Sequence, residues 1–325
     1  MSIIKLKSLV EESCYRIEEE NPQERTMTIS LNEARELLRR EYTEAVDIYK
    51  KDTSFGLYRA YSGAPPHGNQ KFVNRLYLVE PTKTKRRSKE ANNFYTEFIS
   101  SSPLWKDYPK RDHAIIGSTH PKPTVNYGPN LFLVIPRNGA KFAVCSRADC
   151  WESFLFASRF FALPDDVRSI GIDSITSYMA KFFTIVFKMM GLETKDIYQT
   201  MDNNARAFVN MVNQHWKDIV NEIPNVINLI SDNKHGHYNK QTIDRLTHFA
   251  YIILRLKGYG SFETFVEEMF EPKKNGIELI SNIKKFHQHY KEKIVEFWTD
   301  SDCILIPESF RHIIRFSKNE ENPHD

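Results

Sequence analysis

Residues 114–119 read Ala-Ile-Ile-Gly-Ser-Thr, and residues 131–136 read Leu-Phe-Leu-Val-Ile-Pro. Each is a short apolar run that ends in polar or turn-forming residues, which is typical of a strand buried in a sheet. The Asn138-Gly139 pair that follows favours a tight turn into a further strand at residues 140–144. These runs predict a β-sheet in the first half of the chain.

Strand-like segments continue on both sides of these runs. Residues 56–61 are aromatic-rich and residues 74–79 alternate, while residues 296–298 and 303–307 return to a strand pattern near the C-terminus. Between about residues 149 and 290, apolar residues recur at helical spacing. The pattern predicts an α+β fold in which strands from both sides of a helical insertion complete one sheet.

The sequence divides into four predicted parts. A helix that begins at a capping box, formed by Ser30 and Glu33, and ends near Lys51 indicates an N-terminal helical segment. The parts are the helical segment 1–52, a core made of 53–148 and 291–317, the helical insertion 149–290 and a polar tail 318–325.

The composition is that of a globular protein. The chain has 325 residues, of which 41% are hydrophobic and 27% charged, and its formal net charge of +3 is too small to indicate nucleic-acid binding by itself. Cys14, Cys145, Cys150 and Cys303 make neither a disulfide framework nor a zinc pattern, so we expect reduced thiols in a cytoplasmic protein. No secretory signal or membrane span is expected, and no metal site.

Arg59, Ser118, Thr119 and Tyr127 are candidate ligand-binding residues in the strand-rich region. Arg59 lies in an apolar strand, where its guanidinium group either binds a phosphate or carboxylate or points to solvent. The hydroxyl groups of Ser118 and Thr119 end a strand and either bind a ligand or form an ordinary turn. Tyr127, before Gly128, is either a stacking surface or a core residue.

Two further features carry charge. Glu296 opens the strand-like segment 296–298, where it either stabilises developing positive charge or is simply solvated. A basic run lies among aromatic residues and either follows a nucleic-acid backbone or is a solvated loop. The run comprises Lys83, Lys85, Arg86, Arg87 and Lys89. The turn-like segment 106–111 suggests no mechanism.

The order of these residues resembles the ADP-ribosyltransferase superfamily in its arginine/serine/glutamate class. Tyr58-Arg59 matches the aromatic-arginine pair of an early strand, Ser118-Thr119 matches the Ser-Thr of a second strand, and Glu296 matches the glutamate that opens a late strand. The resemblance covers about residues 55–144 and 295–307, and leaves out the helical block.

This sequence departs from the family at two positions. His120 stands where the family usually has a second serine, and Ile294 stands where it usually has an upstream glutamate. In the family that upstream acid often orients an arginine acceptor. Its absence leaves nucleic acid, a small molecule or a different protein site as the acceptor.

The resemblance implies an ADP-ribosyltransferase-like mixed or antiparallel sheet, with NAD as substrate and no metal. It implies that Glu296 stabilises the oxocarbenium character of the ribose, that Arg59 holds the diphosphate and that Ser118 orients Glu296. It also implies further contacts to NAD, made by Tyr58, Ser62, Thr119 and Tyr127.

The resemblance further implies a mono-ADP-ribosyltransferase whose acceptor is RNA, DNA or protein, held by the basic run. Such an enzyme would be a toxin or a factor in conflict between phage and host, with an inhibitor or antitoxin as a further partner. A second reading is a non-catalytic protein that binds nucleic acid or protein through the basic region and the helical block. A third is an NAD glycohydrolase, with water as the acceptor.

Overall fold

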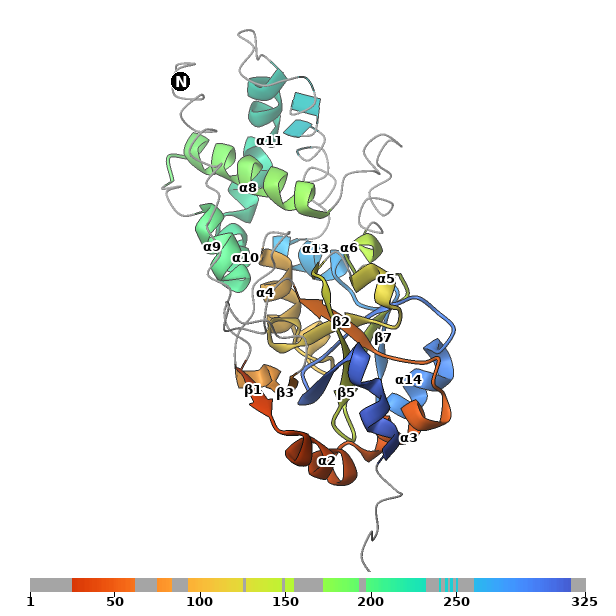
Figure 1. Ribbon diagram of the computed structural model, residues 1–325. Coiled ribbons are helices and arrows are strands. Elements are labelled where there is room, and N and C mark those ends of the chain that lie inside the picture. Colours follow the sequence, from red (N-terminus) through yellow and green to blue (C-terminus); the bar gives the residue numbers. More distant parts are fainter. Residues whose placement is uncertain are drawn as a thin grey trace, which may run out of the picture. The chain divides into compact units, whose positions relative to one another are not determined.

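The computed structural model describes residues 25–61, 75–83, 93–124, 127–147, 150–154, 172–192, 197–231 and 260–316, with single positions between 240 and 250. These residues fall into two compact units (Figure 1). The sheet unit takes the described residues of 25–83, 105–153 and 276–316. The helical unit takes 93–104 and the described residues of 154–275.

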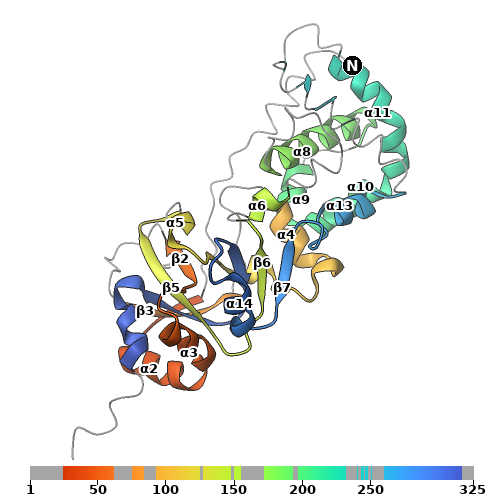
Figure 2. The same cartoon turned by 90° about the vertical axis from the view of Figure 1, so that its right-hand side faces the viewer.

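The sheet unit contains a nine-stranded sheet in which every neighbouring pair is antiparallel. The strands are β1 (Arg25–Ile29), β2 (Tyr58–Tyr61), β3 (Leu76–Glu80), β4 (Ile115–Ser118), β5 (Asn130–Pro136), β6 (Phe142–Cys145), β7 (Ile277–Ile280), β8 (Glu296–Thr299) and β9 (Cys303–Pro307). Their order is β1-β3-β9-β5-β2-β4-β8-β6-β7. In Figure 2, β2 lies beside β5 and β6 lies beside β7. The structure confirms an α+β fold.

Strands from the two ends of the chain alternate in this sheet. β9 pairs with β3 and β5, and β8 pairs with β4 and β6, so each late strand lies between two early ones. Most residues of these strands are apolar and buried, as the continuous hydrophobic runs predict. The prediction that strands from both sides of a helical region complete one sheet is therefore confirmed.

Helices of the sheet unit cover its apolar core. They are α2 (Leu31–Arg40), α3 (Thr43–Lys51), α5 (Pro121–Thr124), α6 (Cys150–Ser153) and α14 (Ile283–Tyr290), with 3-10 segments η1 (Pro81–Lys83), η3 (Arg111–His113) and η6 (Glu308–Phe316). α3 contacts α14, η6 and β5. Phe286 of α14 packs edge-on against Phe142 of β6 and Phe297 of β8, so burial of aromatic surface holds α14 on the sheet.

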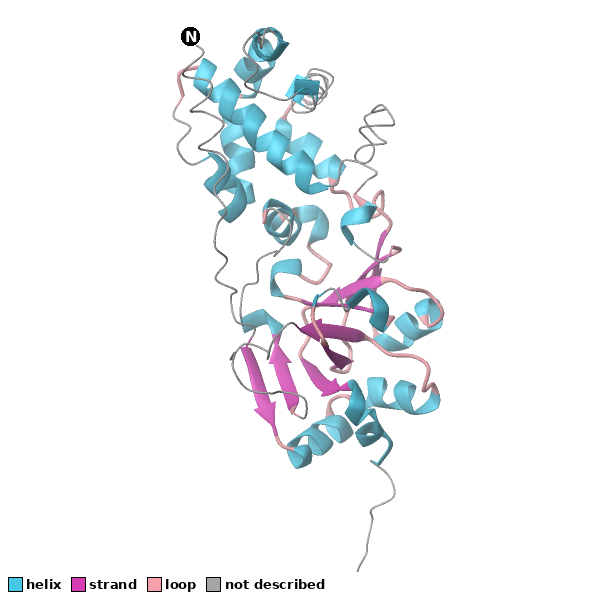
Figure 3. Ribbon diagram, turned by 45° about the horizontal axis from the view of Figure 1, so that its top comes forward, coloured by secondary structure: helices cyan, strands magenta, loops and turns pink. Residues whose placement is uncertain are grey.

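The helical unit, where the structure describes it, consists of α4 (Phe94–Ser101), α8 (Ile172–Met189), α9 (Ile197–Asn203), α10 (Ala205–Gln214), α11 (Trp216–Ser231) and α13 (Phe262–Met269). The 3-10 segment η2 (Pro103–Trp105) follows α4. Figure 3 colours strands magenta, and every strand drawn belongs to the sheet unit. No helix in the described ranges combines the length and the apolar character needed to cross a lipid bilayer.

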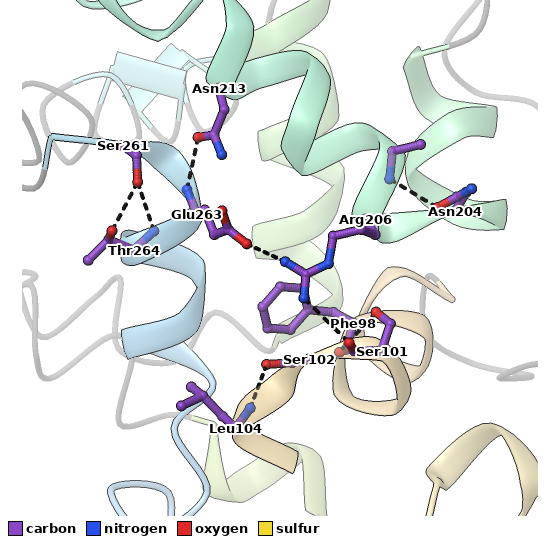
Figure 4. A network of polar contacts seen from close by, with 11 residues as sticks. Phe98, Ser101, Ser102, Leu104, Asn204, Arg206, Asn213, Ser261, Glu263 and Thr264 are labelled. Atoms are coloured by element: carbon purple, nitrogen blue, oxygen red, sulfur yellow. Dashed lines mark hydrogen bonds and ion pairs between the residues drawn. The ribbon is translucent and has the colours of Figure 1, made fainter. Parts of the chain in front are cut away.

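Polar contacts join three helices of the helical unit (Figure 4). The Arg206 guanidinium group of α10 pairs with the Glu263 carboxylate of α13, and it donates to the Ser101 carbonyl of α4 at 3.4 Å. The Asn213 side chain accepts the Glu263 N–H at 3.1 Å. Figure 4 shows the Arg206 side chain between the other two helices, where it satisfies exposed groups at the end of α4 and the start of α13.

The N-terminal segment differs from its prediction. Residues 25–29 form β1, which pairs along its whole length with β3. The helix expected from Ser30 to near Lys51 has the predicted capping box, but it ends at Arg40, and a separate helix, α3, begins at Thr43. The side chain of Asn138 accepts the Glu44 N–H at 3.0 Å and donates to Thr43. A distant turn thus caps α3, which local sequence does not indicate.

The boundaries of the helical insertion also differ. β7 and α14 lie inside the predicted insertion 149–290 but belong to the sheet unit. Conversely, α4 lies inside the predicted core 53–148 but belongs to the helical unit, where Phe94 contacts Phe208 and Phe270. Helical spacing identifies an element but not the partner against which its apolar face packs.

Candidate active site

The three strands that carry the candidate catalytic residues are consecutive neighbours in the sheet. β4 lies between β2 and β8. In the pairing register, Tyr58 of β2 is opposite Ser118 of β4, and Ser118 is opposite Glu296 of β8. Side chains of directly opposite residues lie on one face of an antiparallel pair, with Cβ atoms about 5 Å apart. The fold therefore brings Ser118 beside Glu296.

Arg59 lies where β2 and β4 separate. β2 pairs with β5 along four residues but with β4 only at Tyr58, so the two strands diverge directly after that bridge. The Arg59 guanidinium group donates from Nη1 to the Ile116 carbonyl of β4 at 3.4 Å. The same group stacks on the Tyr61 ring, 4.5 Å from its centroid. Arg59 is half-buried, and it is held at the opening between the strands.

Thr119 holds the start of β8. Its hydroxyl group donates to the Lys293 carbonyl at 2.5 Å and accepts the Val295 N–H at 3.0 Å. The Thr119 N–H donates to the Val295 carbonyl at 3.1 Å. The structure thus gives Thr119 a supporting role, because these bonds join the end of β4 to the residue before Glu296.

Ser118 is buried, and its Oγ accepts the His120 N–H at 3.2 Å. His120 is the position where the resemblance expects a second serine. The turn after β4 therefore begins with a hydrogen bond between neighbouring residues. Ser118 stays in register with Glu296 because β4 pairs with β8 along all four residues.

Glu296 is buried and ionically paired. Its side chain is 6% exposed, and Oε1 accepts a hydrogen bond from Arg111 Nη2 at 2.9 Å. Its Oε2 accepts the Cys150 N–H of α6 at 3.1 Å. A carboxylate buried without such partners would bind a proton, so these donors favour the ionised form.

Arg111 is the residue that sequence reasoning missed. It lies in the segment 106–111, to which the sequence assigned no mechanism, and its side chain is 4% exposed. Burial alone would lower the pKa of Arg111, but Cys150 and Glu296 raise that pKa above its usual range. Because burial raises the pKa of Cys150 itself, Cys150 is a neutral thiol near neutral pH, and Glu296 is the negative charge that Arg111 meets.

No protein-family model matches this chain, and neither does any curated protein or solved structure. The functional argument therefore depends on the residues themselves and on the way this fold arranges them.

Two cysteine residues, Cys145 and Cys150, are neighbours of Glu296. Cys145 of β6 is the register partner of Glu296, and its Sγ lies 2.6 Å from the Ser153 hydroxyl oxygen. A hydrogen bond with the Cys150 thiol lowers the pKa of Cys145, while burial opposes that shift. Among the described residues, no group of three or more His, Cys, Asp and Glu side chains is placed to hold a metal ion.

The remaining predicted site residues lie apart from this cluster or outside the described residues. Tyr58 is buried, and its hydroxyl oxygen accepts a hydrogen bond from Arg311 Nη1 at 2.9 Å, so it serves the core of the sheet unit. Tyr127 is 48% exposed, and it is close enough to Arg111 to influence its pKa. Lys83 pairs with Glu80 at 2.5 Å. Outside the described residues lie Ser62, Lys85, Arg86, Arg87 and Lys89.

Proposed function

We propose that this protein is an NAD-dependent mono-ADP-ribosyltransferase whose core has the ADP-ribosyltransferase arrangement. One observation carries the proposal: the strands with Arg59, Ser118 and Glu296, which are far apart in the sequence, are neighbours in one sheet. The resemblance in sequence requires these residues to meet around one dinucleotide. The three strands are consecutive, and Ser118 and Glu296 are in register; Arg59 follows Tyr58, the residue opposite Ser118, so in this proposal its side chain reaches the dinucleotide where β2 and β4 separate.

The proposed reaction breaks the bond between the nicotinamide nitrogen and C1′ of the ribose. Nicotinamide leaves with the bonding electron pair, positive charge develops on the ribose, and a nucleophilic atom of the acceptor bonds to C1′ and loses its proton to solvent. Glu296 stabilises the developing positive charge, an interaction that is strong in a site of low dielectric constant.

The other residues bind and orient NAD in this proposal. Arg59 holds the diphosphate at the opening between β2 and β4, because a guanidinium group pairs with phosphate through two parallel donors. Ser118 orients the nicotinamide ribose beside Glu296. Exposed Tyr127 offers a ring face to nicotinamide. Tyr58 does not contact NAD in this proposal, because its hydroxyl group is bonded to Arg311 in the core. Thr119 acts indirectly, by bonding the backbone of the residue before Glu296.

The acceptor in this proposal is a macromolecule. Ile294, two residues before Glu296, is 50% exposed and carries no charge, so it offers no partner for an arginine acceptor. A nucleic acid held by the basic run is the acceptor that we favour, because Lys83 and the residues that follow it in the sequence are rich in positive charge.

The first test measures nicotinamide release from NAD labelled in the nicotinamide ring. We expect release by the wild type, strong loss in Glu296→Gln, and a raised KM for NAD in Arg59→Lys, because lysine lacks the two parallel donors. Glu44→Gln is the matched control: Glu44 also accepts a backbone N–H and pairs with a lysine, but it belongs to α3. Binding of NAD without release, or release unaffected by Glu296→Gln, would contradict the proposal.

Glu296→Gln also leaves Arg111 buried without its counter-charge, which costs about 3–5 kcal/mol of stability. Each variant is therefore compared at a temperature where circular dichroism shows it folded. The labelled products then identify the acceptor: modified RNA or DNA supports our choice, modified protein replaces it, and free ADP-ribose alone indicates a glycohydrolase. Nucleic-acid binding that weakens with salt, without any NAD binding, indicates a non-catalytic binding protein.

A further inference from the structure

Three alternate residues, two in β8 and one directly after it, contact one segment of the chain, residues 105–111. Glu296 pairs with Arg111, the Trp298 indole N–H donates to the Pro109 carbonyl at 2.9 Å, and the Asp300 carboxylate accepts the Lys110 N–H at 3.2 Å. Alternate residues of a strand share a face, so these contacts form one row along β8. The row fixes the backbone that leads into Arg111.

The aromatic residues of this region fix the Arg111 side chain as well. The guanidinium carbon lies 4.6 Å from the centroid of the Trp298 ring, a cation–π distance. Trp105, in the same segment as Arg111, has its ring centroid 6.2 Å from that of Trp298. The Arg111 guanidinium group therefore packs on Trp298 and directs its Nη2 at Glu296 Oε1. A guanidinium group keeps its charge when buried, whereas a lysine in this place would lose its proton more readily.

We propose that Arg111 is a positioning residue of the active site: it keeps the buried Glu296 carboxylate ionised and fixes the direction of its Oε1, while Oε2 is fixed by the Cys150 N–H. This inference rests on the proposed function, since it explains how a carboxylate with 6% exposure keeps the charge that the reaction needs. Arg111 itself contacts neither the ribose nor the leaving group in this proposal.

The titratable groups that face this pair come from α6, from β6 and from Tyr127, which lies between α5 and β5. Cys150 of α6 is a neutral thiol, because burial raises its pKa. Cys145 of β6 lies behind Glu296, where its partners are Cys150 and Ser153. Tyr127 is 48% exposed, and it lies close enough to Arg111 to raise the pKa of that residue. Arg147 follows β6, and its carbonyl oxygen accepts the Glu296 N–H at 3.0 Å, whereas the Arg111 guanidinium group bonds the Glu296 carboxylate itself, so removal of Arg111 takes away the cation paired with Oε1.

The experiment compares the full chain with Arg111→Met and Arg111→Lys, with Arg137→Met as the matched control. Arg137 likewise pairs with carboxylates, those of Glu41 and Asp302, but it lies at the end of β5 and contacts the start of β9. The measurement is nicotinamide release from NAD as a function of pH. We expect the acid limb of kcat/KM to move about one pH unit or more upward in Arg111→Met, because Glu296 then holds its proton to higher pH.

Arg111→Lys is expected to keep the acid limb near its wild-type position, because the positive charge beside Glu296 is retained. It is expected to lower kcat, because lysine does not fix the direction of Glu296 Oε1. Arg137→Met is expected to leave the acid limb in place. A merely structural role of Arg111 would lower the folded fraction equally at every pH at which the protein is stable. An acid limb that does not move in Arg111→Met therefore overturns the proposal.

A second measurement does not depend on catalysis. In Arg111→Met the folded state binds a proton at Glu296 that the unfolded state releases, so the loss of stability relative to wild type grows as the pH rises from the unfolded towards the folded pKa of that carboxyl group. The double variant Arg111→Met/Glu296→Gln is expected to lose that growth. If the wild type releases no nicotinamide, the proposed function and the positioning role both fail, and urea unfolding still decides whether Arg111 keeps Glu296 ionised. If the loss of stability in Arg111→Met is constant with pH, the claim that Arg111 keeps Glu296 ionised is overturned as well.

Discussion

Asp52, at the end of α3, joins two segments through one carboxylate. Its Oδ1 accepts hydrogen bonds from the Ser54 hydroxyl at 2.6 Å and the Phe55 N–H at 3.2 Å. Its Oδ2 lies 2.8 Å from His287 Nε2 of α14. The Ser54 hydroxyl and then His287 lower the pKa of Asp52 well below its usual range. Asp52 thus ties α14 to the loop that enters β2.

We expect Asp52→Asn to lower the free energy of unfolding by about 1–3 kcal/mol near neutral pH, since hydrogen bonds to a charged group are lost. The pKa of Asp52 is lowered in the folded state, so its contribution is present above the unfolded pKa of about 4 and is lost as the pH falls below it. Urea unfolding at pH 7 and at pH 3 measures the difference. Exposed Asp47→Asn is the control, and a deficit that is equal at both pH values would contradict the assignment.

At the scale of elements, β4 fits between β2 and β8 because Gly117 has no side chain. A Cβ atom at Gly117 would lie 2.4 Å from the Tyr58 carbonyl oxygen and 2.8 Å from Phe297 Cζ. The first of these is backbone of a neighbouring strand, which cannot rotate away as a side chain can. The close approach of the strands that carry the candidate site therefore requires glycine.

Gly117→Ala is expected to lower the free energy of unfolding by about 1–3 kcal/mol, the usual cost of an added methyl group in a packed core. Chemical denaturation followed by tryptophan fluorescence measures this effect, since Trp298 lies on the adjoining strand. Gly139→Ala separates crowding from backbone strain: Gly139 has φ +75°, yet its Cβ would meet nothing within 4 Å. An equal loss in both variants would show that crowding between strands is not the cause.

At the scale of the whole molecule, each unit has its own buried core, and Phe208 lies in that of the helical unit. Its ring contacts those of Phe94, Phe183 and Phe262, which come from α4, α8 and α13. We expect Phe208→Ala to cost about 3–5 kcal/mol, through lost burial and the cavity left behind. Hydrogen exchange then becomes faster in those three helices, and Phe208→Leu has a smaller effect. Unchanged exchange in α4 and α13 would contradict this view of the core.

Local patterns in the sequence determined the strands β2 to β6, β8 and β9 and the start of α2, because buried strands and capped helices carry short-range signals. The same short-range signals placed Arg59, Ser118 and Glu296 on three predicted strands, although the function of these residues stays a prediction. The start of α3 could not be predicted from the local sequence, because it is capped by Asn138, which is 95 residues away from Thr43.

Only the tertiary structure decided the partner of Glu296. Arg111 is 185 residues away along the chain and follows a turn with no distinctive pattern. The sequence determined that an arginine and a glutamate are present, but a buried charge is stabilised by the group that folding brings within hydrogen-bonding distance. That distance depends on the pairing of β4 with β8 and on the row of contacts along β8, which are properties of the assembled sheet.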